Sequence, residues 1–108
     1  MPYASLTLYR GDDVTLGVTV LTSSGTAYNL SGCALDLNAR QNTYFSTLLF
    51  NKHVTQHLSG DIGQSQFTLV PADTNGIDDS THYHDVKLTS AAGLITTLQY
   101  GPFYVIPK

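Results

Sequence analysis

The chain has 108 residues and few charges: five Lys and Arg, eight acidic residues that are all Asp, and a formal net charge of −3. The five cations stand singly, whereas nucleic-acid and membrane-surface proteins cluster theirs, so we expect neither kind of partner. No apolar run approaches the roughly 20 residues that span a bilayer. The beginning of the chain lacks the basic and apolar regions of a signal peptide. A single Cys excludes an internal disulfide.

The first half of the chain shows the alternation of apolar and polar side chains that is typical of half-buried strands. Residues 14–20 place Val14, Leu16, Val18 and Val20 on one side, with Thr or Gly between them. Residues 33–40 repeat this pattern from Cys33 onward, and turn-forming clusters separate the two segments. Both segments are therefore predicted strands with one face on a core.

The second half continues the pattern with one interruption. Residues 65–69 and 84–88 alternate in the same way, and Pro71–Thr74 between them is the one candidate for a helical turn. The cluster at 90–93 joins strands 83–89 and 94–100 as a predicted hairpin. Gly101-Pro102 is expected to end this run, before a short closing strand over 103–106.

These elements predict a single all-β domain over residues 1–108. We expect about seven to nine antiparallel strands in a two-sheet sandwich, because a single open sheet would leave one apolar face uncovered. At most one short helical turn is expected.

Four histidines are the best candidates for a metal site. His82 and His84 share one face of a strand, and His53 and His57 are expected to share a face of another. Known zinc sites combine His with Cys or carboxylates at recognisable spacings, which are missing here. We therefore expect these histidines to pack at the edge of the core, with no metal or cofactor.

Other motifs have simpler structural interpretations. Cys33 alternates with core residues, so it is expected to be a buried structural thiol. Asp73–Asp79 resembles a calcium loop only faintly, since its Gly stands at the wrong position, and an Asx-rich turn fits better. Arg10-Gly11-Asp12 matches an integrin-binding tripeptide but is also ordinary turn chemistry. No nucleophile elbow, acid–base pair or phosphate loop is recognisable, so we expect no enzyme.

Seven tyrosines and no Trp are spread along the chain. Tyr combines a large contact area with a polar tip, which suits interfaces. Tyr83 follows the predicted helical turn and is interpreted as a tyrosine corner of the kind found in immunoglobulin-type sandwiches. The terminal segments are the predicted contact regions, with interface candidates Tyr3, Tyr9, Phe103, Tyr104 and Ile106.

Five turn and packing motifs follow one another along the chain: Arg10-Gly11-Asp12-Asp13, Asn29-Leu30-Ser31-Gly32, Pro71-Ala72-Asp73-Thr74, Tyr83-His84-Asp85-Val86 and Gly101-Pro102-Phe103-Tyr104-Val105. Their order resembles that in the immunoglobulin-like modules of bacteriophage particles, including the N-terminal module of baseplate upper proteins. The resemblance spans nearly the whole chain and departs at His82, where related modules often carry an aromatic residue.

The resemblance implies an immunoglobulin-like virion protein, made in the bacterial cytoplasm and assembled with other virion proteins. Because the chain stops at Lys108 without a trimeric stalk, it implies a capsid decoration or cement protein, or else a small tail, baseplate or collar adaptor. The protein is expected to form a homo-oligomer or to be present in many copies per particle. A carbohydrate-binding sandwich is the alternative from another class, and it requires exposed aromatic residues in a row on one face. A metal-dependent enzyme would require the four histidines to converge.

Overall fold

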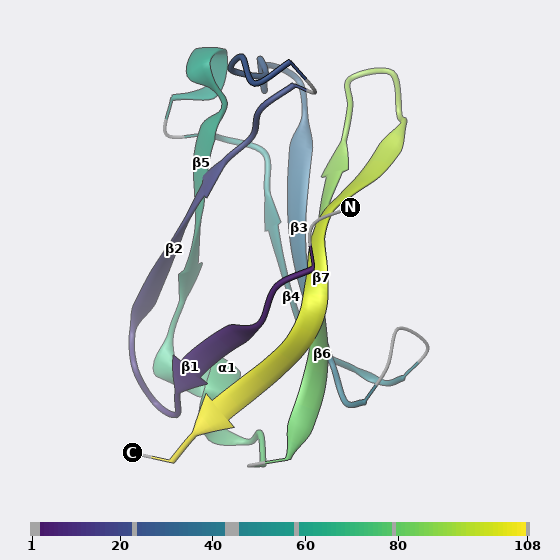
Figure 1. The fold of residues 1–108 in the computed structure, drawn as a ribbon. Helices are drawn as coiled ribbons and strands as arrows, with labels where there is room; N and C mark the ends of the chain where they lie inside the picture. Colours follow the sequence, from purple (N-terminus) through teal and green to yellow (C-terminus); the bar gives the residue numbers. More distant parts are fainter. Residues whose placement is uncertain (1–2, 23, 43–45, 58, 79, 108) are drawn as a thin grey trace.

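The computed structural model describes residues 3–22, 24–42, 46–57, 59–78 and 80–107. It contains two sheets that face each other (Figure 1). The strands are β1 (Leu6–Tyr9), β2 (Val14–Thr19), β3 (Ala34–Arg40), β4 (Leu48–Val54), β5 (Gln64–Leu69), β6 (Thr81–Thr89) and β7 (Ile95–Ile106). The larger sheet has the order β1-β7-β6-β3-β4, and the smaller one pairs β2 with β5. All these pairings are antiparallel except β1 with β7, which is parallel.

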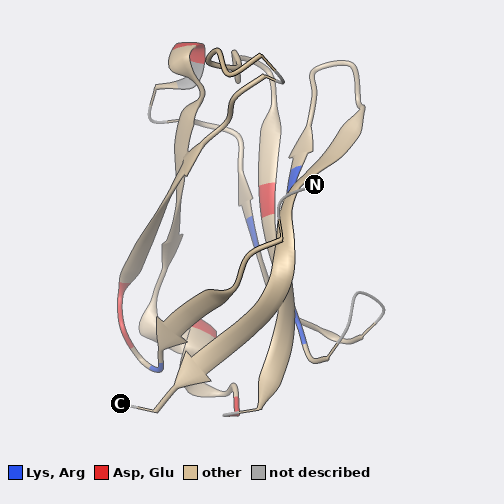
Figure 2. Ribbon diagram, in the orientation of Figure 1, with Lys and Arg blue, Asp and Glu red and all other residues tan. Residues whose placement is uncertain are grey.

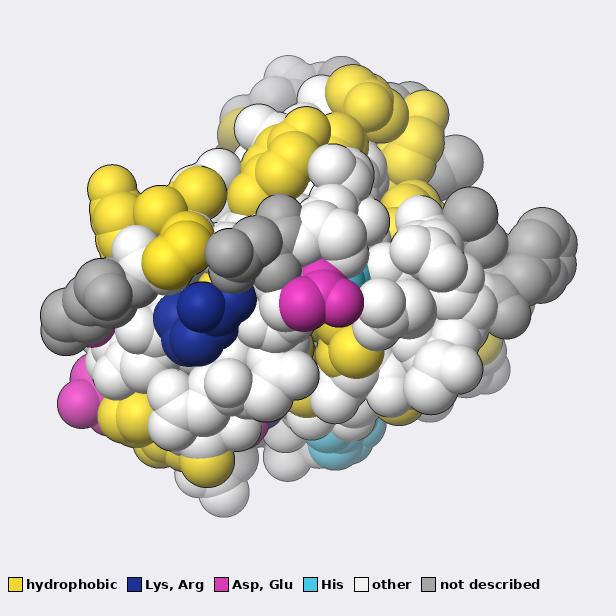
Figure 3. Space-filling view, turned by 90° about the horizontal axis from the view of Figure 1, so that it is seen from below, with side chains coloured by type: hydrophobic (Ala, Val, Ile, Leu, Met, Phe, Trp, Pro, Cys, Tyr) yellow, Lys and Arg dark blue, Asp and Glu magenta, His cyan; other side chains and the backbone are white. Residues whose placement is uncertain are grey.

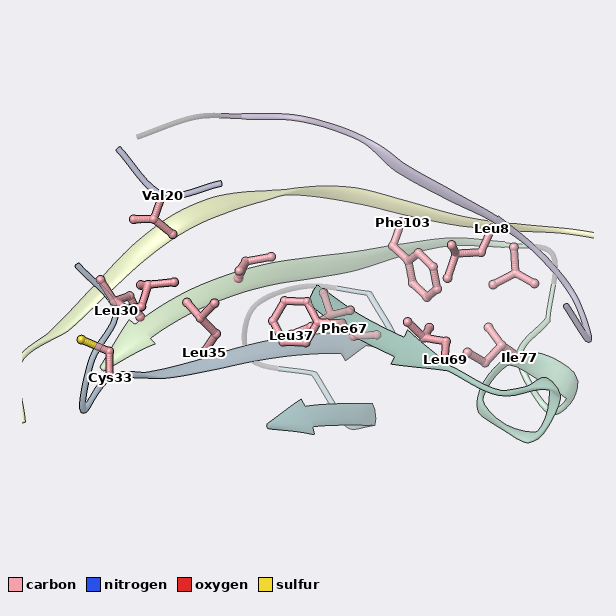
Figure 4. Packing of buried hydrophobic residues seen from close by; sticks show 14 residues of the cluster. Leu8, Val20, Leu30, Cys33, Leu35, Leu37, Phe67, Leu69, Ile77 and Phe103 are labelled. Atoms are coloured by element: carbon pink, nitrogen blue, oxygen red, sulfur yellow. The ribbon is translucent and has the colours of Figure 1, made fainter. Parts of the chain in front are cut away.

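The core lies between the two sheets and is built from the alternate positions that the sequence indicates. Leu35 and Leu37 of β3, Phe67 of β5 and Phe103 of β7 are at most 1% exposed. Figure 4 shows these side chains pointing into the space between the sheets. Burying one such side chain stabilises the fold by about 1.5–3 kcal/mol. The predicted strands over 14–20, 33–40, 65–69 and 84–88 and the 83–100 hairpin are confirmed.

The expected break at Gly101-Pro102 is wrong, because β7 runs without interruption from Ile95 to Ile106. Pro102 has no N–H to donate, but β1 pairs with β7 only from Phe103 onward, so the missing donor lies where that pairing stops. Gly101 permits a close approach of the N-terminal segment: a Cβ atom there would lie 2.1 Å from the Ala4 carbonyl oxygen. The two residues therefore shape the strand without ending it.

The predicted helical turn is present as α1 (Pro71–Asn75). The Asp73 carboxylate accepts a hydrogen bond from the N–H of Val70, the N-cap residue, at 2.7 Å, as the third helical residue does in a capping box. A 3-10 turn, η1 (Gly60–Ile62), lies in addition before β5. In the described part of the chain, no helix has the length and apolar character needed to cross a membrane.

Candidate binding surface

The outer face of the larger sheet carries a row of aromatic and apolar side chains along β7. Since Phe103 and Val105 point into the core, the alternation of the strand turns Tyr100, Pro102, Tyr104 and Ile106 outward. The N-terminal segment adds two more rings on the same face. Tyr3 contacts Tyr100 edge-on with ring centroids 5.4 Å apart, and Tyr9 lies opposite Ile106. We call this set the tyrosine stripe: Tyr3, Tyr9, Tyr100, Pro102, Tyr104 and Ile106.

The structure places four of the five predicted interface residues in this stripe. Tyr3 is 67%, Tyr9 55% and Ile106 37% exposed, and Tyr104 is half-buried. The prediction for Phe103 is wrong. Its side chain is fully buried and meets the Phe50 ring edge-on at 5.9 Å, because odd-numbered positions at this end of β7 face the core.

Beside the stripe, polar side chains form a hydrogen-bonded row across β4, β3 and β6. The Asn51 amide donates to Asn38 Oδ1 at 2.8 Å, and the Asn38 amide donates to Asp85 Oδ1 at 2.9 Å. Asp36 extends the row, since its Oδ1 lies 2.8 Å from His53 Nδ1. We call these five residues the polar ladder: Asp36, Asn38, Asn51, His53 and Asp85.

Asp85 connects the ladder to the stripe and is unusually placed for a carboxylate. It lies opposite both Asn38 and Tyr100 in the sheet register, and its side chain is fully buried. Oδ1 is bonded to Asn38, whereas Oδ2 has no hydrogen-bond partner among the described residues. A buried polar atom without a partner is rare in folded proteins, because it raises the free energy of the folded state. The Asp85 side chain is therefore destabilising in this position.

A shallow hollow of about 240 Å³ lies over the same part of the sheet. Its walls include the rings of Tyr3, Tyr83, Tyr100 and Pro102. Tyr83 stands two residues before Asp85 on β6, so both side chains belong to the outer face. Asn42 and Thr81 also line the hollow, whereas the buried Asp85 does not belong to its lining.

Charge contributes little to the surface. Figure 2 shows the Lys, Arg and Asp positions scattered over the fold, without a concentration of either sign. Seen from the end at which β1 and β7 finish, hydrophobic side chains form groups separated by backbone and by side chains of other kinds, with few charged side chains among them (Figure 3). Contacts at the tyrosine stripe would therefore depend mainly on shape and apolar area.

His82 and His84 point into the core from β6, and each meets its own partners. The Nδ1–H of His84 donates to the Gly101 carbonyl at 3.1 Å, while its Nε2 accepts from the Gln99 amide at 2.9 Å. His82 contacts the Gln41 carbonyl through Nδ1 at 2.7 Å and the Asp78 carbonyl through Nε2 at 3.1 Å. Burial lowers the pKa of His84, and this effect exceeds the opposing influence of nearby backbone carbonyls and of Asp85.

The other two histidines lie elsewhere and do not join them. His53 belongs to the polar ladder on the outer face. His57 follows β4 and bridges Ser65 Oγ at 2.8 Å and the Cys33 carbonyl at 2.9 Å. Among the described residues, no three His, Cys, Asp or Glu side chains come together as a metal site. Cys33 itself is buried in the core, as predicted.

The remaining motifs form structural turns near α1. Asp73 pairs with Lys52 at 2.9 Å in addition to its contact with Val70. Asp78 accepts hydrogen bonds from Ser80, whereas Asp79, the last residue of the calcium-like segment, lies outside the described residues. In the Arg10-Gly11-Asp12 tripeptide, the Arg10 guanidinium donates twice to the Ile77 carbonyl and the Gly11 N–H donates to Thr74 Oγ1. These contacts hold the β1–β2 turn against α1.

A second concave feature opens on the side of the sandwich, between β2 and β7. This cleft of about 510 Å³ is lined by core side chains of both sheets, including Leu16, Phe67 and Leu98. It exists because two strands, β2 and β5, face five. Its polar lining residues are Thr19, His84, Thr97 and Gln99.

The topology defines an immunoglobulin-like β-sandwich. In the larger sheet, strands C, F and G of that fold correspond to β3, β6 and β7, and β4 corresponds to an additional strand of variable-type domains. In the smaller sheet, strands B and E correspond to β2 and β5. The predicted fold class is thus confirmed. In such domains the hydroxyl of a corner tyrosine forms a hydrogen bond to backbone a few residues upstream. Here the His82 ring forms a hydrogen bond of this kind, to the Asp78 carbonyl. The role of Tyr83 as a tyrosine corner stays a prediction.

Comparison with known proteins identifies no family. No protein-family model and no curated protein matches the chain. A chain in the structure of ICOS with ICOS-L and an anti-ICOS-L VNAR domain is similar, with a TM-score of 0.45 and 12% sequence identity. The match covers 97% of the present chain and 54% of the ICOS-structure chain, so the present chain spans about half the length of that neighbour. The extracellular domain of the voltage-gated sodium channel beta4 subunit has a TM-score of 0.45 and 13% identity, over 100% of this chain and 94% of that one.

Proposed function

We propose that the chain is a non-enzymatic structural protein of a bacteriophage particle. Its role is that of a capsid decoration or cement protein, present in many copies, which stabilises the shell by burying surface against neighbouring subunits. The proposal rests on the motif resemblance described above. In the structure, the observation that supports the proposal best is the exposed end of the tyrosine stripe, at Tyr9 and Ile106.

That end is suited to contact with another protein. Tyr9 and Ile106 are exposed, face outward side by side, and lie next to Tyr104. Tyr is enriched in interfaces, and charged residues are depleted at their centres, which agrees with the low charge of this surface. We call Tyr9, Tyr104 and Ile106 the contact end of the stripe.

The edge of the larger sheet adds a second means of attachment. β1 pairs with β7 on one side and is the outermost strand of its sheet, so its other side offers backbone N–H and C=O groups to a partner strand. Strand addition at this edge would place the partner beside the contact end. Together these features support attachment without any chemical step.

The experiment is a particle analysis. Particles purified from infected cells are expected to contain the protein in many copies, detected by mass spectrometry, with density for a small sandwich on the capsid surface in electron micrographs. Density confined to the tail, baseplate or collar would instead assign the adaptor role. Absence of the protein from intact particles would overturn the proposal.

Matched variants test the contact end itself. The double substitution of Tyr9→Ser and Ile106→Ser is expected to reduce incorporation into particles, because it removes apolar area without touching the core. Leu94→Ser is the control, since Leu94 is 71% exposed in the β6–β7 turn, away from the contact end. Equal incorporation of both variants would reject this surface as the contact.

A further inference from the structure

We propose that the cleft between β2 and β7 receives an extended strand of a neighbouring protein, which pairs with the free edge of β2 and places apolar side chains in the cleft. The inference deepens the attachment role, and it rests on the proposed function only in taking the neighbour to be another virion subunit. The cleft is separate from the contact end, since Tyr9, Tyr104 and Ile106 do not belong to its lining.

The first observation is the free edge of β2. This strand pairs with β5 on one side, and no described strand pairs with it on the other (Figure 1). The backbone groups of a strand point alternately to its two sides. Val20 donates to the Gly63 carbonyl on the β5 side, so Gly17 and Thr19 turn their N–H and C=O groups toward the open edge. Both residues line the cleft, so a strand that enters it meets these groups.

The second observation is that this edge lacks the features that usually protect one. Free edges commonly carry charged side chains, Pro or a bulge, which prevent another strand from pairing. The sequence of β2 is Val-Thr-Leu-Gly-Val-Thr, and its pairing with β5 shows no register shift. On the opposite side of the sandwich β4 contacts β5, and Lys52 of β4 pairs with Asp73 of α1. The edge of β2 therefore offers a template for pairing.

The third observation is the apolar lining beside that edge. Leu16 and Val18 of β2 are half-buried, as is Leu98 of β7, and all three line the cleft. Residues 16–21 line it without a gap, which extends it along roughly 17–20 Å, the length of an ordinary strand. A partner strand of this length would turn about two or three side chains inward, because side chains alternate between its faces. Apolar side chains at those positions would cover the exposed parts of the lining.

The chemistry of the cleft favours a partner strand over other occupants. Small-molecule sites usually present a few converging polar side chains, but here the two larger polar side chains, His84 and Gln99, are bonded to each other. A second copy of the chain could offer its own β2 edge. However, Leu16 and Val18 of that copy pack against its own core and would leave the cleft unfilled. The occupant that uses both the edge and the lining is an extended segment with alternate apolar residues.

The test uses the full chain and synthetic peptides. The probes are acetylated heptapeptides with Val, Leu, Ile or Phe at alternate positions and Thr between them, flanked by Lys for solubility. Control peptides have the same composition but carry their apolar residues side by side. Binding is followed by NMR. We expect the alternating peptides to bind and the controls not to bind, with amide shifts and slower hydrogen exchange at Gly17 and Thr19.

Matched variants separate pairing from folding. Gly17→Pro removes an N–H that faces the open edge and leaves the bonds to β5 in place, so it should weaken peptide binding by about tenfold. Gly17→Ala keeps that N–H and should bind like the unmodified chain. Circular dichroism checks that both variants fold. Leu98→Ser should also weaken binding without any change in β2, and Leu94→Ser, in the exposed β6–β7 turn, is its control.

The outcomes distinguish this inference from the proposed function. If the protein is absent from particles while alternating peptides bind at β2, the strand site stands and the virion role fails. If no alternating peptide binds, or if Gly17→Pro and Leu98→Ser both bind normally, the strand site is rejected wherever the protein is found. A dimer of the free chain that protects Gly17 and Thr19 from exchange would also reject it, because a second copy would then cover the edge.

Discussion

Lowering the pH is expected to destabilise this sandwich through His84, a fully buried ring on the core face of β6. The neutral ring fits its surroundings, because Nδ1–H donates to the Gly101 carbonyl and Nε2 accepts from the Gln99 amide. A second proton would set a ring N–H against an amide N–H and would place a charge on a fully buried side chain. Burial is accordingly the main cause of the lowered pKa.

The sign follows from the two states of the chain. In the unfolded chain His84 binds a proton near its ordinary pKa of 6.5, whereas in the folded protein it does so only at lower pH. The unfolded state therefore binds more protons between these two values. The contribution of His84 to stability is complete above pH 6.5 and is lost as the pH falls through this window. Because one proton is involved, the slope is at most about 1.4 kcal/mol per pH unit.

The assay is urea unfolding at a series of pH values from 8 to 5, followed by circular dichroism. The variant His84→Gln is the reference, since it conserves a hydrogen-bonding side chain that does not titrate. Other groups titrate in both proteins, so the difference between their free energies of unfolding isolates His84. Below pH 6.5, the free energy of unfolding of the unmodified chain should fall relative to that of His84→Gln. A difference that stays constant with pH would refute the reasoning.

Two predictions concern packing and backbone conformation. Phe103→Ala should lower the free energy of unfolding by about 3–5 kcal/mol because it empties a core position. Ile106→Ala, on the outward face of the same strand, should lower it by less than about 1 kcal/mol. Similar losses for the two variants in urea titrations would contradict the assignment of the two faces. Gly63→Ala should lower the melting temperature, since Gly63 has φ +75° and a Cβ atom there would lie 2.4 Å from the Val20 carbonyl oxygen. Gly17→Ala, with open space at that position, should leave the melting temperature nearly unchanged, and equal effects of the two would show that the close approach is unimportant.

The strands were predictable because their signal is local. Each of β2, β3 and β5 alternates apolar and polar residues with a period of two, and one buried face is enough to produce that pattern. The same local reasoning wrongly predicted that the strand would end at Gly101-Pro102. Proline weakens a strand only where its missing N–H is needed, and that depends on where the neighbouring β1 begins to pair.

The candidate surface was predictable only in part. Alternation places Phe103 and Tyr104 on opposite faces of β7, but the sequence alone does not say which face meets a second sheet. The polar ladder escaped prediction altogether. Asn38, Asn51 and Asp85 belong to three different strands, and only their register brings them into one row.

Local chemistry therefore accounts for the strands, the turns and the single sandwich, since propensity and periodicity act over a few residues. The site depends on contacts between residues far apart in the chain. Asn38 and Asp85 meet across 47 positions, and Tyr3 reaches Tyr100 only because the N-terminal segment runs beside β7. Strand order and register set these contacts, and both arise from the packing of the whole chain around one core.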